Sequence, residues 1–303
     1  IDEMKKNGET VLDGSEAFKL YDTYGFPLDL TKEILNEENF DLDENKFSEE
    51  MENQRQLARN ARKSDSGWSL DNIVTDGIDP TEFVGYDILK VEANISNIFD
   101  ESENISSLNK GDKGIILSDR TSFYAQGGGQ VADTGFIYNQ GGKAKVTDVQ
   151  KKNDLFFHSV EVVEGEIQTN QKYTFKVDQE RRYDITRNHS ATHLLDQALR
   201  DVLGDEITQA GSLVDENRLR FDFTYNESLT SEEKRKIEDI INEKIREQLP
   251  VVKQIVSFKK SQEMGAIGLF EDKYKENVRV VSIGDYSKEL CGGCHVNNSS
   301  EVL

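Results

Sequence analysis

The sequence lacks several features that would place it in a specialised class of protein. No apolar run in its 303 residues approaches the roughly 18 residues that a helix needs to cross a membrane. Its two cysteines lie close together and offer no disulfide framework of the secreted kind, which favours a reducing compartment. We therefore expect a soluble protein and predict a cytoplasmic location.

Positive charge is also scarce. Lys and Arg number 37 against 58 Asp and Glu, so the net charge is -21, which argues against a globally basic nucleic-acid binder because phosphate contacts need local Lys and Arg. Two short basic stretches remain, namely Arg55, Arg59, Arg62 and Lys63, and Arg181, Arg182 and Arg187. Each is either a small RNA-binding face or ordinary solvated charge on a helix or loop.

The length allows two or three domains, each with its own core. Because the sequence begins at Ile1 and not at a methionine, we expect an internal piece of a longer chain. The predicted fold class is a multidomain α+β protein. Its predicted parts are a helical segment (1–62), a linker (63–81), a small antiparallel β-barrel-like subdomain (82–180) and an α+β core (181–303).

The N-terminal part has the pattern of helices. Ser15 is a candidate N-cap for a first helix that ends before Pro27, and further helices are predicted over 29–36 and 47–62. Turn-forming residues fill 63–81, and Trp68 is predicted to pack this linker onto a neighbouring part.

Short strands follow, separated by Gly and Asn clusters as in a small antiparallel barrel or sandwich. They are predicted over 88–91, 114–117, 131–138, 144–149, 156–163 and 173–177.

After Arg181 helices and strands mix. A helix is predicted over 189–203, ending at Gly204, and a half-buried strand over 219–223. Residues 230–233 fit a capping box for a helix that continues to Pro250. Strands are predicted over 251–258 and 278–283, the last running directly into the cysteine segment.

Two short segments gather most of the side chains that bind soft metals. Residues 188–195 and 289–295 contain three of the four histidines and both cysteines. On a helix, His189 and His193 lie on one face, roughly opposite an apolar face. Cys291 and His295 can complete the tetrahedral N/S shell that zinc favours. A lone histidine pair would be ordinary polar residues at a helix start, but the second segment favours one zinc ion.

The Cys-Gly-Gly-Cys-His segment has two other interpretations. It matches the attachment pattern of c-type haem, and Cys-x-x-Cys also occurs in redox proteins. Neither explains the histidine pair, so we predict zinc. Gly292 and Gly293 leave room for the backbone to fold tightly around an ion or to approach a ligand.

A third segment, 119–130, contains three successive glycines followed by Gln130. It lacks the Gly-Lys-Ser/Thr ending of a P-loop, so it does not support nucleotide hydrolysis. It is either a hairpin turn or a wall that lets a bulky substrate approach Gly127, Gly128 and Gly129, with hydrogen bonds from Thr121 and Gln130.

These segments resemble the alanyl-tRNA synthetase family. Asn-His-Ser-Ala-Thr-His (188–193) and Glu-Leu-Cys-Gly-Gly-Cys-His (289–295) are similar to the two zinc-ligand motifs of its editing domain, and residues 121–130 to its glycine-rich motif. Residues 14–30 resemble the end of its tRNA-recognition region, which the free-standing editing relatives lack. The resemblance implies an internal piece of the synthetase, without the ATP-binding aminoacylation core before it or the C-terminal domain after it.

The resemblance also implies a function. His189, His193, Cys291 and His295 would bind zinc, and the site would hydrolyse the ester that links serine or glycine to alanine tRNA. A pocket for alanine cannot strongly reject an analogue that adds a hydroxyl, so a second site is needed. The expected partners are the mischarged 3′ end of tRNA(Ala) and the rest of the synthetase chain in cis.

Candidate roles follow for individual residues. We expect Thr121 to contact the serine hydroxyl and Gln130 to orient the substrate or water, both as catalytic residues. The family usually has threonine in place of Cys294, whose thiol would substitute for Cys291 or add oxidation sensitivity.

The role of zinc has more than one interpretation. The ion can activate water or polarise the ester carbonyl, but four protein ligands leave no vacant position, as in structural sites. Either one ligand is loose, so that water or substrate enters the shell, as we expect, or the metal only positions the amino group or 3′ end of the substrate. The alternative hypothesis is a structural zinc-binding module that docks tRNA without hydrolysis.

Overall fold

We describe the protein from a computed structural model. The structure describes residue 4 and residues 10–24, 26–38, 40–63, 70, 73–100, 103–268 and 276–302. Backbone contacts divide the chain into two compact units, Ile1–Leu70 and Asp71–Leu303. This division falls inside the predicted linker 63–81, and the predicted domain limits stay predictions. Among the described residues, no helix combines the length and apolar character that a membrane span requires.

Two of the sequence-based predictions fall outside this description. Trp68 is not among the described residues, and the side chains of the first basic stretch, Arg55, Arg59, Arg62 and Lys63, are not described either.

The first unit is mainly helical, with α2 (Gly14–Tyr24), α3 (Leu28–Glu37) and α4 (Glu44–Lys63). Two short strands, β1 (Val11–Leu12) and β2 (Asp41–Leu42), pair in parallel. Helix α2 is capped by Asp13, whose Oδ1 accepts the Ser15 N–H at 2.7 Å. The predicted cap at Ser15 is therefore wrong, because the carboxylate just before the helix satisfies a free N–H of its first turn.

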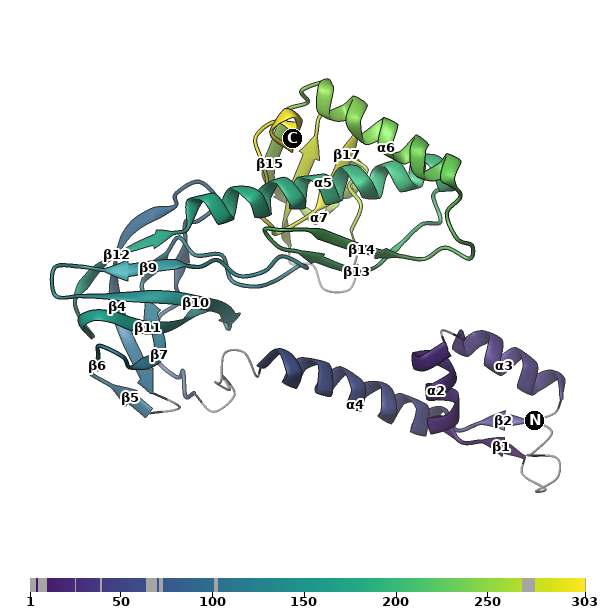
Figure 1. Ribbon diagram of the computed structural model, residues 1–303, viewed down its shortest axis with the longest axis horizontal. Coiled ribbons are helices and arrows are strands. Elements are labelled where there is room, and N and C mark those ends of the chain that lie inside the picture. The colour runs from purple at the N-terminus through teal and green to yellow at the C-terminus, as the bar shows by residue number, and fades with distance from the viewer. Residues whose placement is uncertain are drawn as a thin grey trace. The chain divides into compact units, whose positions relative to one another are not determined.

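The second unit contains a closed antiparallel barrel (Figure 1). Its strands are β4 (Lys90–Asp100), β7 (Lys113–Ser118), β9 (Gly135–Tyr138), β10 (Gly142–Lys152), β11 (Leu155–Gln168) and β12 (Lys172–Val177). Their order is β10-β9-β12-β4-β7-β11, and a further pairing of β10 with β11 closes the ring. The prediction left a barrel and a sandwich open, and the structure is a barrel.

Two smaller strands extend the barrel sheet, and two others form a separate pair. Strand β5 (Glu103–Ile105) pairs with β4, and β6 (Ser107–Asn109) pairs with β11. Strand β3 (Glu82–Phe83) pairs in parallel with β8 (Arg120–Thr121). Along β12 every second residue, namely Tyr173, Phe175 and Val177, is buried in the barrel core, as the strand period of two requires.

The remainder of the second unit packs helices against a smaller sheet. Helix α5 (Gln179–Leu203) runs on from β12, and α6 (Ser231–Arg246) lies beside it (Figure 1). The sheet has the antiparallel order β15 (Val251–Ser257), β16 (Asn277–Ile283) and β17 (Ser287–Leu290). A hairpin of β13 (Gln209–Val214) and β14 (Leu219–Phe223), helix α7 (Phe258–Glu263) and the 3-10 turn η3 (Ser299–Val302) complete this part.

Hydrophobic packing holds the histidine helix in place. Leu194 of α5 packs with Ile245 and Val251 in one buried cluster. Ala198 and Leu199 pack with residues of α6 in another. The capping box predicted at Thr230 and Glu233 is confirmed at the start of α6.

Two predicted boundaries in this part are wrong. Helix α5 begins at Gln179 and not at His189, because Asp178 caps it by accepting the Arg181 N–H. Strand β16 does not run directly into the cysteine segment. The chain turns at Gly284, whose φ is +53°, and returns as β17 before reaching Cys291.

Candidate functional site

The four predicted metal ligands come together between α5 and the segment that follows β17. Their ligand atoms all lie within 4.8 Å of one another. Cys291 Sγ is 3.5 Å from His189 Nε2 and 3.3 Å from His295 Nε2. In a tetrahedral zinc site, Zn–N bonds of about 2.1 Å and Zn–S bonds of about 2.3 Å place nitrogen and sulfur about 3.6 Å apart. The spacing of the cluster, which includes His193, therefore fits zinc.

Gln130 fixes the orientation of the first ring. Its Oε1 lies 2.7 Å from His189 Nδ1 and accepts the backbone N–H of Cys294 at 2.8 Å. Because an amide oxygen can only accept, His189 Nδ1 carries the proton and Nε2 keeps its lone pair for a metal. A hydrogen-bonding partner of this kind is typical of metal-binding histidines.

The other two rings have partners on Nδ1 as well. His295 Nδ1 lies 3.1 Å from Ser190 Oγ. His193 Nδ1 lies 3.3 Å from Glu289 Oε1, within ion-pair distance, although the two groups are not aligned as a hydrogen bond. For His295 the partner leaves Nε2 free to face Cys291 Sγ, which lies 3.3 Å away.

The electrostatics of the cluster suit a divalent cation. Burial lowers the pKa of His189 to about 4 and that of His193 and His295 well below the usual range, so the three rings are neutral and able to bind a metal. Burial raises the pKa of Cys291 to about 12. A thiolate at this position therefore needs a bound cation, which would lower that pKa. Three neutral imidazoles and one thiol form a donor set that fits zinc.

Close backbone approach occurs at Gly293 and not at Gly292. A Cβ atom on Gly293 would lie 1.9 Å from His189 Cε1, whereas a Cβ on Gly292 would meet nothing within 4 Å. Gly293 also donates its N–H to Cys291 Sγ at 3.3 Å. Any side chain at Gly293 would therefore displace the His189 ring or the loop.

The glycine-rich segment forms a tight hairpin that delivers Gln130 to the cluster. Gly127 and Gln130 exchange backbone hydrogen bonds of 3.1 and 3.0 Å. Gly128 and Gly129 have φ angles of +58° and +83°, in the left-handed region that a type I′ turn needs at both central positions. The turn thus accounts for Gly128 and Gly129, while the contact of Gly127, Gly128 and Gly129 with a substrate stays a prediction.

Thr121 lies in a buried network and not on an open wall. It is 0% exposed, and its Oγ1 is 2.7 Å from His158 Nε2. His158 Nδ1 lies 3.0 Å from the carbonyl oxygen of Ile116, which can only accept, so Nε2 takes the hydroxyl proton of Thr121. The hydroxyl also accepts the Phe123 N–H at 3.1 Å. In this conformation it has no proton left to donate to a substrate.

The second basic stretch is not a uniform solvated face. Arg182 is 3% exposed and donates through Nε to Asp133 Oδ1 at 2.8 Å, through Nη2 to Asp133 Oδ2, and through Nη1 to the Gly85 carbonyl at 2.6 Å. Both interpretations offered for this stretch are wrong for Arg182, because its charge is used to join α5 to the barrel. Arg187, by contrast, is exposed and pairs with Asp184 at 3.0 Å.

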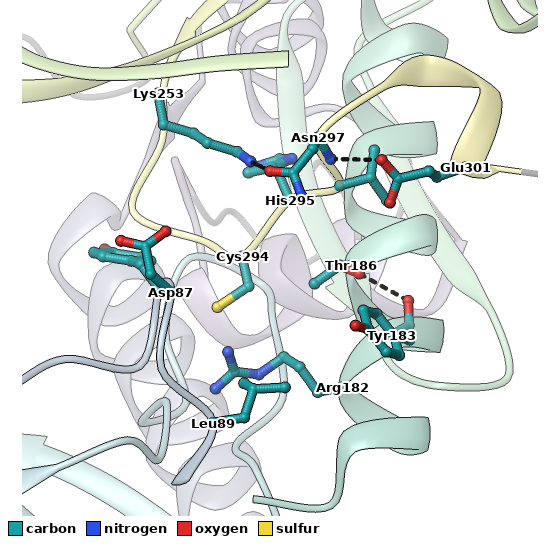
Figure 2. A pocket seen from close by; sticks show the side chains of 12 residues that line it. Asp87, Leu89, Arg182, Tyr183, Thr186, Lys253, Cys294, His295, Asn297 and Glu301 are labelled. Atoms are coloured by element: carbon teal, nitrogen blue, oxygen red, sulfur yellow. Dashed lines mark hydrogen bonds between the residues drawn. The ribbon is translucent and has the colours of Figure 1, made fainter. Parts of the chain in front are cut away.

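A cavity of about 190 Å³ lies beside the cluster. Figure 2 shows Cys294 in the middle of it, with the sulfur on the side of Arg182. Its lining residues are Tyr86, Asp87, Leu89, Arg182, Tyr183, Thr186, Lys253, Cys294, His295, Val296, Asn297 and Glu301.

An adjoining cavity of about 250 Å³ shares Tyr86, Asp87, Lys253, Cys294 and His295 with the first. Arg279 also lines it. A ligand in either cavity would therefore lie next to His295, one of the four candidate metal ligands.

Comparison with known proteins extends the resemblance. The family model described as "tRNA synthetases class II (A)" matches residues 1–181, and that described as "Threonyl and Alanyl tRNA synthetase second additional domain" matches residues 278–302. Two curated relatives named "Alanine--tRNA ligase", from Thermoanaerobacter sp. (strain X514) and Thermoanaerobacter pseudethanolicus (strain ATCC 33223 / 39E), are each 45% identical over 303 residues. The chain belongs to the alanyl-tRNA synthetase family.

The match covers 100% of the chain and 34% of each relative, so the chain spans about a third of the length of these synthetases. The resemblance predicted from the motifs is confirmed. In this alanyl-tRNA synthetase region, the family-model match over 278–302 includes two of the four candidate ligands, Cys291 and His295. The other two, His189 and His193, lie in α5, outside that match.

Proposed function

We propose that this region of the synthetase edits mischarged tRNA. It hydrolyses the ester bond of seryl- and glycyl-tRNA(Ala) at a site that contains one zinc ion. The observation that carries the proposal is the His/Cys cluster of His189, His193, Cys291 and His295, which lies next to two cavities in a chain of this family. The complete chain would be a cytoplasmic alanine-tRNA ligase, with the mischarged 3′ end of tRNA(Ala) as the partner of this site.

The chain's own residues bind and orient the substrate. When bound, zinc would supply positive charge for an ester carbonyl or a water molecule. Because four protein ligands fill a tetrahedral shell, we assign the ion mainly to positioning the substrate.

Gln130 is our candidate for the chemical step, although its side chain is 0% exposed and lines neither cavity, so a substrate reaches it only after neighbouring side chains move. Its Oε1 is engaged by His189 and Cys294, while its Nε2 is buried with no hydrogen-bond partner among the described residues. A buried donor without a partner costs about 1–3 kcal/mol, and a substrate carbonyl or a water that accepts from it would remove that cost. We therefore assign Nε2 to orienting the ester or the attacking water.

The Thr121 hydroxyl is already bound to His158 and is not free to contact a substrate. Contact with a serine hydroxyl would require its own hydroxyl to leave His158, whereas in the present conformation it holds the start of the segment that leads to Gln130. A serine contact would also not explain the removal of glycine. Gly128 has open space at which a substrate can approach this segment, whereas a Cβ on Gly127 would already contact Tyr124 Oη at 3.9 Å.

A deacylation assay tests the proposal. Seryl-tRNA(Ala) and alanyl-tRNA(Ala) are incubated with the chain and, separately, with the complete synthetase. We expect both to release serine much faster than the buffer blank, to leave alanyl-tRNA largely intact, and to lose activity in the His189→Ala variant. Seryl-tRNA that stays as stable as the blank with the zinc-loaded complete synthetase would overturn the proposal.

The second candidate function is a structural zinc module that docks tRNA. It is favoured by one observation, the closed set of four protein ligands. It predicts that His189→Ala lowers thermal stability and tRNA binding in a protein that never hydrolyses the ester. The same assay, run with a tRNA-binding measurement, separates the two functions.

A further inference from the structure

Three consecutive backbone carbonyls in the candidate metal loop are each bound by a side chain from elsewhere in the chain. Tyr86 Oη donates to the Gly292 carbonyl at 2.8 Å. Arg279 Nη1 donates to the carbonyls of Cys291 and Gly293 at 2.8 and 2.9 Å. Tyr86 lies between β3 and β4, and Arg279 lies in β16. The loop is thus held from two separate parts of the fold.

These two side chains also hold one another. The guanidinium carbon of Arg279 lies 4.1 Å from the centre of the Tyr86 ring, a distance typical of a cation–π contact. The Tyr86 ring meets Phe83 edge-on, with centroids 4.9 Å apart, and Phe83 stacks on Phe156 of β11 at 5.4 Å. A continuous series of ring contacts therefore joins the barrel to the loop.

The loop has little freedom to move. Gly293 lies so close to His189 that a single added carbon would overlap the ring, so the loop cannot approach α5. Movement away from α5 would increase the 3.5 Å separation between Cys291 Sγ and His189 Nε2. The two atoms would then be too far apart to bind one tetrahedrally coordinated ion.

We propose that Tyr86 and Arg279 are positioning residues of the metal centre. By holding the carbonyls of residues 291–293, they place the Cys291 sulfur at metal-binding distance from the histidines, and the barrel thereby sets the affinity for the ion. This inference deepens the proposed function because it concerns the same site. Its test, however, measures metal binding and not hydrolysis.

Two conservative variants test this role. Tyr86→Phe removes only the hydroxyl that binds Gly292, on a side chain that is 42% exposed, so it leaves no cavity in a core. Arg279→Lys keeps the positive charge but loses the planar guanidinium, which lies against the Tyr86 ring while its Nη1 reaches both carbonyls. The matched control is Tyr225→Phe, which removes a hydroxyl from a side chain that is 37% exposed and donates to Glu233 at 3.3 Å.

The measurements are zinc affinity by chelator competition, the absorption of the cobalt-substituted protein, and the melting temperature of the metal-free protein. Loss of partners beyond the direct ligands typically weakens metal binding by about 10–100-fold. We expect about a tenfold loss of zinc affinity in Tyr86→Phe and a larger loss in Arg279→Lys. Both should shift the cobalt–thiolate band, because the sulfur is displaced. Tyr225→Phe should match the parent.

Each other outcome overturns the inference. If both variants bind zinc as the parent does and keep its cobalt spectrum, the loop does not depend on these side chains. If only the metal-free melting temperature falls, their role is limited to folding. Tyr86→Phe keeps the test decisive even if Arg279→Lys fails to fold. Failure of the parent to deacylate seryl-tRNA would overturn the proposed function and leave this result standing.

Discussion

Replacing Arg182 with methionine would remove the charge that neutralises Asp133 while keeping most of the side-chain length. Both residues are almost fully buried, with 3% and 1% of their side chains exposed. Removing one partner of a buried ion pair costs about 3–5 kcal/mol, because the remaining charge stays buried without compensation. Asp133 keeps one partner, since it accepts the Tyr124 N–H at 2.7 Å, so we expect the lower part of this range.

Urea denaturation followed by circular dichroism measures the change. For a unit the size of Asp71–Leu303, 1 kcal/mol corresponds to about 2–4 °C in melting temperature, so a parallel thermal scan should show a fall of about 6–12 °C for a loss of about 3 kcal/mol.

The double variant Arg182→Met with Asp133→Asn provides a further check. The asparagine keeps an acceptor for the Tyr124 N–H but carries no charge. It should therefore recover about 1–3 kcal/mol relative to Arg182→Met alone.

The matched control is Arg187→Met on the same helix. Arg187 and Asp184 are each 47% exposed, and such pairs contribute about 0–1 kcal/mol. If Arg182→Met cost no more than Arg187→Met, the conclusion that the Arg182–Asp133 pair joins α5 to the barrel would be refuted.

Three further predictions concern the buried histidine, the loop glycines and the second thiol. Burial lowers the pKa of His158 from 6.5 to about 4. Between pH 6.5 and pH 4 the histidine is protonated in the unfolded chain but stays neutral in the folded chain. The free energy of unfolding should therefore fall as the pH drops through this range, by up to about 3 kcal/mol. Denaturation midpoints at several pH values measure this, and His158→Gln should be less sensitive to pH over this window. Gly293→Ala should greatly reduce the zinc content of the purified protein, because of the overlap with His189, while Gly292→Ala should not. Cys294→Thr should retain one zinc ion, because the backbone N–H that binds Gln130 is kept in the variant and the thiol is outside the four-ligand cluster.

Clear outcomes would count against each of these. A pH profile that is identical in His158→Gln and the parent would show that this ring does not produce the acid sensitivity. Equal zinc content in the two glycine variants would contradict the close approach at Gly293. Zinc loss in Cys294→Thr would make that thiol a ligand.

The four-ligand cluster was predictable because spacing within a helix and within a short loop limits where ligands can point. His189 and His193 share a helical face wherever that helix begins. The three partners of the rings were not predictable in this way, because Gln130 lies 59 residues from His189 in the sequence and only the folded hairpin brings them together.

The errors also have physical causes. Charge patterning describes exposed faces, so it could not identify Arg182, whose partner Asp133 is 49 residues away. The start of α5 was missed because its first turns have few apolar residues, although Asp178 is a good cap. Likewise, Thr121 looked available for a substrate because nothing near it in the sequence indicates His158.

Helix α5 links several of these features, and its length has a consequence for how a substrate enters. Its 25 residues extend over about 37 Å at 1.5 Å per residue. Arg182, bonded to the barrel, and His189 and His193, bonded to the metal loop, lie on this one continuous rod. The barrel and the core therefore cannot open like the two halves of a hinged clamp without breaking the bonds of Arg182 to Asp133 and Gly85 or bending the helix. A substrate has to enter through movement of side chains and short loops around an otherwise rigid frame.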